Sequence, residues 1–410
     1  MAQLRKTERT PTMDVSFRFL VLLAIFFSAL GSLASEQKLP YLLVDTHIDA
    51  PIRAYYNDMN VLDGTNAGEF DLPRAQQGGL STVFMSIYTP PSAKDDGTSN
   101  SLAHELIDWV EATASSSDSI GIATCTTDVR KLHAAGTLGF ALGMENGSPL
   151  EGDVSKLGSF VDRGIRYITL AHGKSNEFSD SSYDENEPHG GLSDAGRELV
   201  SAMNAHGIII DISHLTDDAT WQVLELSENP VLATHSSLRH FIPDFHRNLP
   251  DELVVAVGEN GGVVNINFGS SFVSNEARLW QTKRSEAMAA RADAEEMTRD
   301  ERIAFYAEYQ DQNPFPFATV ATVVDHIDRV VELTSVDHVG IGSDYDGVGD
   351  TLPVGLKDVS MFPNLIAELQ ERGYDDTELR KILGENVMRV WKANEVIAAM
   401  HGNPTTCTQT

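Results

Sequence analysis

The feature that most constrains the fold is a series of eight short apolar runs spread along the chain. Each run is apolar almost throughout, which is typical of parallel strands buried on both faces. The runs lie at 41–49, 81–88, 140–145, 165–172, 208–214, 230–235, 262–268 and 338–344.

Amphipathic segments separate these runs, as at 193–206 and 216–227. Ser193 and Thr216 stand where helix N-caps are needed, and Gly207 stands where a helix end needs a left-handed residue. Eight strands that each precede a helical segment predict an α/β fold of the (β/α)8 TIM barrel type. We expect a single domain of this type over residues 35–400, followed by a C-terminal tail at 401–410.

The interval between the seventh and eighth runs is unusually long. Residues 274–309 within it are highly charged, rich in Ala, Glu and Arg, and helical in pattern. We interpret this stretch as a helical insertion of one or two surface helices and not as a second domain. Two further segments, 361–372 and 377–395, are predicted to be closing helices.

The N-terminus has the pattern of a secretory signal peptide. Basic residues between Arg5 and Arg18 precede an apolar run at 19–30, and the small residues Ser32 and Ala34 follow. This pattern predicts a signal peptide over residues 1–34, with Met1 or Met13 as the start, and a secreted or periplasmic protein. The apolar run is shorter than the roughly 20 residues of a bilayer span. A signal-anchored protein is the second interpretation, and we expect no stable membrane anchor.

Composition excludes some partners and one kind of site. The net charge of −30 repels phosphate backbones, so we expect no nucleic acid partner. The two cysteines, Cys125 and Cys407, have neither the number nor the spacing of a thiolate zinc site. Whether they pair with each other stays open, because sequence does not give their distance.

Ionisable residues gather at the ends of the apolar runs. In a barrel of this type the C-terminal ends of the strands form the active-site face, so these side chains should meet at one mouth. Burying so many charges together requires a cation. The residues are His47, Asp49, Glu145, His172, His214, His235 and Asp344.

Imidazole and carboxylate ligands without thiolates favour zinc. His47 and Asp49 are alternate residues of one strand and point to the same face. Three histidines and two carboxylates exceed what one tetrahedral zinc needs, whereas two ions that share Glu145 would use them all. A hydroxide held between two such ions is a strong nucleophile at neutral pH.

Each of these residues also has a structural interpretation when it is taken alone. His214 and His235 would be core histidines bonded to the backbone, Glu145 a solvated loop acid, and Asp344 the cap of a turn. These interpretations must all hold at the same end of different strands, which favours the metal site.

The same residues, in their local context, resemble the membrane (renal-type) dipeptidase family, peptidase family M19, within the amidohydrolase-like barrel class. The resemblance runs through nearly the whole chain after the signal segment, and its loops look like the bacterial branch. The motifs that carry it are VDTHIDAP, FDLPRAQQGGLSTVF, GMENG, YITLAHGKSNEFSDSSYD, IIIDISHLTDDATWQVL, PVLATHSS, HRNLPDE, HVGIGSDYDGV and LGENVMRVW.

The resemblance implies a dipeptidase with two zinc ions per chain. His47 and Asp49 would hold one ion, His214 and His235 the other, and Glu145 would bridge them.

The resemblance also implies roles for three further residues. His172 would face the substrate carbonyl oxygen, and Arg247 would clamp the free carboxylate of the dipeptide. Asp344 would pass a proton from water to the leaving amine. Asp346 is the rival of Asp344, since the segment GSDYDG offers two acids, and Arg247 without the family context would be an ordinary loop arginine.

Two other functions stay open at this point. One is a different binuclear metal amidohydrolase that acts on a lactam, a lactone or an amide. The other is a barrel that binds a ligand without catalysis. The resemblance also implies small dipeptides, some with a C-terminal D-residue, as substrates and a homodimer as the assembly.

Overall fold

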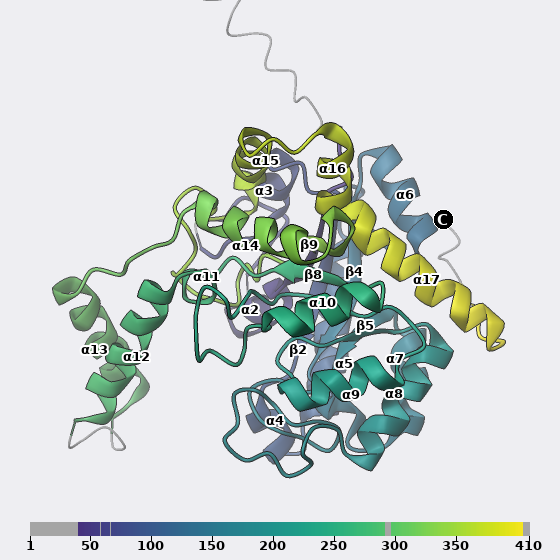
Figure 1. The fold of residues 1–410 in the computed structure, drawn as a ribbon, viewed down its shortest axis with the longest axis horizontal. Coiled ribbons are helices and arrows are strands. Elements are labelled where there is room, and N and C mark those ends of the chain that lie inside the picture. Colours follow the sequence, from purple (N-terminus) through teal and green to yellow (C-terminus); the bar gives the residue numbers. More distant parts are fainter. Residues whose placement is uncertain (1–39, 58, 66, 292–296, 405–410) are drawn as a thin grey trace, which may run out of the picture. The chain divides into compact units, whose positions relative to one another are not determined.

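Eight parallel strands form the predicted barrel, and all eight apolar runs contribute one strand each (Figure 1). The computed structural model describes residues 40–404 apart from 58, 66 and 292–296, so the predicted signal peptide and Cys407 lie outside the described residues. The barrel strands are β1 (Val44–Ile48), β2 (Thr82–Tyr88), β4 (Leu138–Glu145), β5 (Ile165–Thr169), β6 (Ile209–Asp211), β7 (Leu232–Ala233), β8 (Val263–Ile266) and β9 (Val339–Ile341).

Neighbouring barrel strands pair in parallel register from β1 through to β9. The last strand then returns to the first, because Asp344 N–H donates to His47 O over 3.1 Å and Asp49 N–H donates to Tyr345 O over 2.9 Å. These two bonds nearly close the barrel. They also fix the ends of β1 and β9, which carry three of the predicted site residues, against each other.

One additional strand, β3 (Ile120–Ile122), pairs with the start of β4 outside the barrel path. It was not predicted, because three residues are too short to form a recognisable apolar run.

Helices surround the strands in Figure 1. They are α2 (Ala50–Asn57), α3 (Leu72–Gln77), α4 (Pro91–Asp95), α5 (Ser99–Ser115), α6 (Thr126–Ala135), α7 (Leu157–Asp162), α8 (Asp194–His206), α9 (Asp217–Leu226), α10 (Asp251–Glu259), α11 (Ser270–Val273), α12 (Asn275–Ala289), α13 (Arg299–Gln312), α14 (Val320–Leu333), α15 (Phe362–Glu371), α16 (Asp376–Arg380) and α17 (Asn386–Met400).

The helix caps follow the sequence prediction. Ser193 Oγ accepts the Gly196 N–H at the start of α8, and Thr216 Oγ1 accepts the Ala219 N–H at the start of α9. Gly207 ends α8 with a φ of 67°, the left-handed conformation that favours glycine. Each cap satisfies backbone groups that a helix end leaves without a partner.

The predicted insertion between the seventh and eighth barrel strands consists of α12 and α13, which project away from the barrel in Figure 1. The second closing segment, expected as one helix at 377–395, differs from the prediction. It is α16 and α17 joined by a π-helical turn, and a Cβ on Gly384 in that turn would lie 2.4 Å from the Leu42 carbonyl oxygen. The turn therefore lets the chain pass close to the start of β1.

The N-terminal ends of the strands are closed by apolar packing. Trp391 of α17 lies 5.1 Å from Phe84 of β2, and Phe84 lies 5.4 Å from Tyr167 of β5, ring centre to ring centre. All three side chains are fully buried. The polar site is thereby confined to the opposite end of the barrel. None of the helices in the described part of the chain combines the length and the apolar character needed to cross a bilayer.

Candidate metal centre

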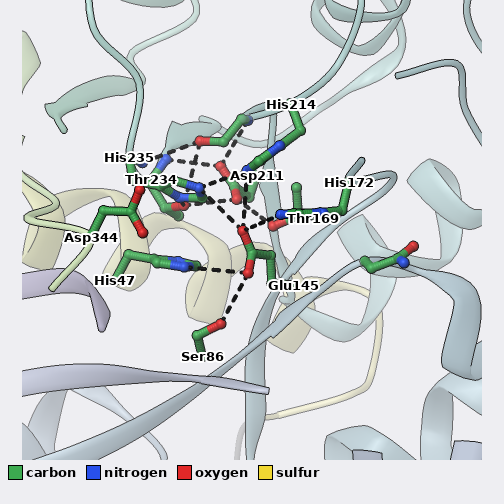
Figure 2. Close-up of polar contacts among 12 residues, drawn as sticks. His47, Ser86, Glu145, Thr169, His172, Asp211, His214, Thr234, His235 and Asp344 are labelled. Carbon is green, nitrogen blue, oxygen red and sulfur yellow. Dashed lines mark hydrogen bonds and ion pairs between the residues drawn. The ribbon is translucent and has the colours of Figure 1, made fainter. Parts of the chain in front are cut away.

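The seven ionisable residues predicted at the strand ends converge at the C-terminal mouth of the barrel. Figure 2 labels all of them except Asp49. Their donor atoms form three overlapping groups, and within each group all donor atoms lie within 4.8 Å of one another. The groups are His47, Glu145 and His235; Glu145, His172 and His214; and His47, Asp49 and Asp344.

Glu145, the last residue of β4, stands between the histidines, with its two oxygens facing different partners. Oε1 lies 3.1 Å from His214 Nε2 and 3.2 Å from His235 Nε2. Oε2 lies 3.5 Å from His47 Nε2, and that nitrogen lies 3.5 Å from Asp49 Oδ2. The carboxylate therefore has one oxygen beside each of two ligand pairs.

Several of these atoms are buried without a hydrogen-bond partner among the described residues. His47 Nε2 and Asp49 Oδ1 are both in this state. His214 Nε2 and His235 Nε2 face each other at 2.9 Å. A buried polar atom without a partner is costly, and nitrogen lone pairs directed at a common point are the arrangement that a metal ion requires. The donor set therefore fits divalent cations.

Neighbouring side chains hold the ring nitrogens that face away from the centre. The Tyr167 hydroxyl lies 2.8 Å from His47 Nδ1, and Thr234 Oγ1 lies 2.8 Å from His235 Nδ1. Asp211 Oδ2 in turn accepts the Thr234 hydroxyl over 2.8 Å. Such contacts orient metal-binding imidazoles and fix which nitrogen carries the proton.

The electrostatics of the cluster favour the metal-binding charge state for His214, His235 and Glu145 but not for His47. Burial, reinforced by the charge of Arg247, holds the pKa of His214 well below its usual value. Burial and the charge of His47 do the same to the pKa of His235. For Glu145, burial alone would raise the pKa, but the neighbouring His172 and His47 hold it well below its ordinary value. Neutral imidazoles and an ionised carboxylate are the ligand forms. Burial alone would lower the pKa of His47, but the neighbouring Tyr167, Glu145 and Asp49 raise it well above its usual value, so this ring must lose a proton to bind an ion.

Two of the strand-end residues have backbones in the left-handed region, His214 with φ of 69° and Asp344 with φ of 61°. Non-glycine residues adopt this conformation rarely and at an energetic cost, and such residues cluster at functional sites. Here the conformation turns each side chain toward the mouth at the point where its strand ends.

The two acids of the GSDYDG segment have different surroundings. Asp344 lies with His47 and Asp49, and its Oδ2 accepts the Asn267 amide over 2.6 Å. Asp346 instead accepts the Glu69 N–H over 2.6 Å and pairs with Arg53 Nε at 2.8 Å. Burial raises the pKa of Asp344 well above its usual value.

Arg247 is buried beside the cluster and not exposed in the cavity wall. Its guanidinium donates to Ser236 Oγ over 2.7 Å and to the His235 carbonyl over 2.8 Å, while its Nε has no partner among the described residues. Its charge nevertheless lowers the pKa of His214, after burial itself.

A cavity of about 460 Å³ opens above the cluster. Besides all of the strand-end residues except His47, its wall includes Tyr88, Tyr183, Phe272, Arg278 and Gln281. A cavity of this size suits a small ligand. Arg278 and Gln281 come from α12, so the predicted surface insertion contributes to the cavity.

Three supporting residues were not predicted. Asn267 stands at the end of the seventh apolar run, and the rule that identified the other strand-end residues applies to it equally. Asp211 is an acid inside an apolar run, which is also a visible signal. Tyr167 gave no signal, because a tyrosine in a buried strand has the pattern of a core residue.

Comparison with known proteins gives concordant results. Residues 37–404 match the family described as membrane dipeptidase (peptidase family M19). An uncharacterised dipeptidase of Schizosaccharomyces pombe is 32% identical over 92% of this chain and 89% of its own length.

Two solved structures are similar over most of their length. The probable dipeptidase PvdM of Pseudomonas aeruginosa has a TM-score of 0.76 and 28% identity, over 88% of this chain and 96% of that one. A metallopeptidase of Rhodobacter sphaeroides, liganded with a phosphinate mimic of the dipeptide L-Ala-D-Ala, has a TM-score of 0.71 and 26% identity, over 86% of this chain and 99% of that one.

Proposed function

The chain belongs to the membrane dipeptidase family, peptidase family M19, and from this premise we propose that it hydrolyses dipeptides with two zinc ions held around Glu145. It is a peptide-bond hydrolase of a metallopeptidase family. The observation that carries the proposal is the position of Glu145, whose two oxygens face separate ligand pairs.

His47 and Asp49 would hold one zinc ion, His214 and His235 the other, and Glu145 would bridge them. Zinc is favoured over harder cations because most of the ligands are imidazoles, and thiolates are absent from the cluster. When bound, the ions would polarise the substrate carbonyl and make a water molecule acidic near neutral pH.

Asp344 would move the proton. Hydrolysis forms a C–O bond from water and breaks the C–N bond, and one proton must pass from water to the leaving amine. Asp344 lies within the group that contains His47 and Asp49, and Asn267 orients its carboxylate. Asp346 is less suited to this role, because Arg53 and the Glu69 amide already engage it.

His172 and Arg247 would bind the substrate. His172 Nε2 lies 3.4 Å from Glu145 Oε1 and lines the cavity, so it is close enough to donate to a carbonyl oxygen placed over the cluster. Arg247 would attract the terminal carboxylate of the dipeptide, and its buried Nε is the donor left without a partner among the described residues.

Dipeptides with a C-terminal D-residue belong to the proposed substrate range. The support comes from the Rhodobacter sphaeroides metallopeptidase, whose bound ligand mimics L-Ala-D-Ala.

The test is turnover of a dipeptide panel by the zinc-loaded protein. We expect release of free amino acids from L,L or L,D dipeptides, loss of activity after chelation, and recovery on addition of zinc. Glu145→Gln should abolish recovery, whereas Glu187→Gln, the same change at an exposed position, should not. A protein that binds zinc but cleaves only lactams or lactones would contradict the proposal.

We further propose that residues 1–34 direct export and are then removed. The support is the order of basic, apolar and small residues in that segment. N-terminal sequencing of the protein recovered outside the cytoplasm should begin at Ser35, and a protein that retains residues 1–34 would contradict the proposal.

A further inference from the structure

The cavity wall contains a guanidinium without an ionic partner, that of Arg278 on α12. Its side chain stacks on the Phe245 ring, with Cζ 4.0 Å from the ring centre. It makes no hydrogen bond or ion pair with any side chain in the described part of the chain. Gln281, one turn further along the helix, lines the same cavity.

Among the described arginines, Arg284 on the same helix also lacks an ionic partner, but its guanidinium lies over the Trp280 and Tyr306 rings and it does not line the cavity above the cluster. The chain has sixty acidic and thirty basic residues, so acceptors for a guanidinium are abundant. Arg278 is half-buried, and burial lowers its pKa although arginine stays charged. A guanidinium that is partly removed from water without an acceptor is a binding group for an anion that the protein itself does not supply.

Arg278 and Arg247 each contact one ring of an aromatic pair. Arg247 Cζ lies 5.7 Å from the centre of the Phe272 ring, and Arg278 stacks on Phe245. The two rings lie 5.7 Å apart, centre to centre. The two guanidinium groups therefore each lie beside a different ring of one aromatic pair.

The two arginines differ in their distance from the reacting groups. Arg247 donates to the His235 carbonyl oxygen over 2.8 Å, so it lies directly beside one of the strand-end residues. Arg278 makes no hydrogen bond or ion pair with a strand-end residue in the described part of the chain, and its guanidinium stacks on Phe245 instead. In a dipeptide the terminal carboxylate is three bonds from the scissile carbonyl carbon, so its partner must be the nearer arginine. An anion bound by Arg278 must therefore lie further from the scissile bond than the terminal carboxylate does, on the side chain of the same C-terminal residue.

We propose that Arg278 binds an acidic side chain on the C-terminal residue of the dipeptide, so that the enzyme prefers Asp or Glu at that position. The inference rests on the proposed dipeptidase activity and on Arg247 as the partner of the terminal carboxylate. There is room for such a side chain, because Arg278 and Gln281 also line a second hollow of about 330 Å³ along α12. The strongly acidic chain would otherwise repel this substrate.

The experiment compares dipeptides that differ only in the charge of one side chain. kcat and KM are measured for Ala-Asp against Ala-Asn and for Ala-Glu against Ala-Gln, with Ala-Ala as the common reference. Both configurations of the second residue are tested. We expect the wild-type kcat/KM to favour the acidic member about tenfold, as a partly exposed charge-assisted hydrogen bond would give. In Arg278→Gln this ratio should fall to about one, mainly through KM, while Ala-Ala changes less than about twofold.

Lys283→Gln is the matched control. It removes a positive charge from an exposed position of the same helix, outside both hollows, and should leave the acidic preference intact. Thermal melts of both variants verify folding.

The other outcomes are distinguishable. If the wild type cleaves Ala-Ala but does not prefer the acidic member, or if Arg278→Gln keeps the preference, the inference is wrong and the dipeptidase proposal stands. If Arg278→Gln weakens all substrates equally, Arg278 binds the terminal carboxylate and the side-chain assignment is overturned. If the zinc-loaded wild type cleaves no dipeptide at all, both the proposed function and this inference are wrong.

Discussion

The approach of two carboxylates to each other at the barrel mouth depends on Gly347. A Cβ at this position would lie 2.2 Å from Asp49 Oδ2 and 2.3 Å from Asp344 Oδ1. Both distances are far below van der Waals contact, so any side chain would displace a proposed zinc ligand and the proposed proton carrier together.

We therefore predict that Gly347→Ala lowers kcat/KM by about 100-fold or more, since a displacement on the order of 1 Å is enough for such a loss. Gly158→Ala is the control, because a Cβ at Gly158 in α7 meets no atom within 4 Å. Steady-state kinetics of both variants provide the measurement. Unchanged kinetics in Gly347→Ala would mean that Asp49 and Asp344 do not need their observed positions.

The hydroxyl of Tyr167 is a second determinant at this scale. It contacts His47 Nδ1 and so orients the ring whose Nε2 faces Glu145. We predict that Tyr167→Phe weakens zinc binding by about 10- to 100-fold, the usual effect of removing such a contact. Zinc retention in competition with a chelator is the measurement.

Tyr374→Phe is the control for this change, because it removes a tyrosine hydroxyl that bonds to Asp328 far from the cluster. Equal zinc retention in the two variants would show that Tyr167 has no role in the metal site.

The sequence identified the ionisable residues of the site but not the residues that orient them through hydrogen bonds. All seven strand-end residues meet as predicted. They could be predicted because a charged side chain within an apolar run is recognisable from the sequence alone. Tyr167 was missed because its contact with His47 spans 120 positions and its residue type is common in cores. Arg247 was predicted only through the family resemblance, since nothing local distinguishes a loop arginine.

At the scale of elements, α14 is tied to the loops around the cavity by a buried histidine. His326 Nδ1 accepts the Leu238 N–H over 3.1 Å, and its Nε2 lies 3.1 Å from the Val273 carbonyl at the end of α11. Because the side chain is fully buried, desolvation lowers the pKa of His326 to about 4.

This shift predicts a pH dependence of stability. A histidine whose pKa is lower in the folded state than in the unfolded state, about 6.5, stabilises the fold above pH 6.5. That contribution is lost as the pH falls from about 6.5 to about 4, because the unfolded chain binds the proton first. The loss amounts to roughly 2–3 kcal/mol by pH 4.5.

His326→Asn keeps an acceptor for Leu238 and removes the titration. The free energy of unfolding of both proteins in chelator, followed by urea titration between pH 7 and 4.5, is the measurement. The variant should lose less stability than the wild type over this interval, whatever its stability at pH 7. Parallel curves for the two proteins would contradict the assignment.

The sequence predicted the type and order of the barrel elements better than their ends. Every apolar run became a strand, but β7 has only two paired residues where six were expected. The remainder of that run leaves the ladder so that Thr234 can contact Asp211 and His235 can face Glu145. Strand ends that supply site residues lose regular backbone pairing. The pattern of apolar residues therefore does not predict where such a strand ends.

At the scale of the whole molecule, the insertion after β8 was predicted to form surface helices, and none of the predicted site residues lies in it. Its sequence is charged and helical, and nothing in its periodicity indicates which residues face the barrel. The structure brings Arg278 and Gln281 of α12 to the cavity wall. A functional contact of this kind depends on the direction in which the helix leaves the barrel, which is a tertiary property.

The net charge of −30 also acts on the whole molecule. It disfavours anionic partners at long range, and it makes the few cationic groups at the mouth decisive for any substrate that carries a carboxylate. Specificity should therefore be more sensitive to charge changes at Arg247 and Arg278 than to equal changes elsewhere on the surface.

The central claim is that Glu145 lies between two zinc ions, and anomalous diffraction at the zinc absorption edge from crystals of the zinc-loaded protein tests it most directly. We predict two anomalous peaks per chain, each about 2.0–2.2 Å from its ligands, one at His47 and Asp49 and the other at His214 and His235, both touching Glu145. A single peak, or two peaks that do not share Glu145, would contradict the claim.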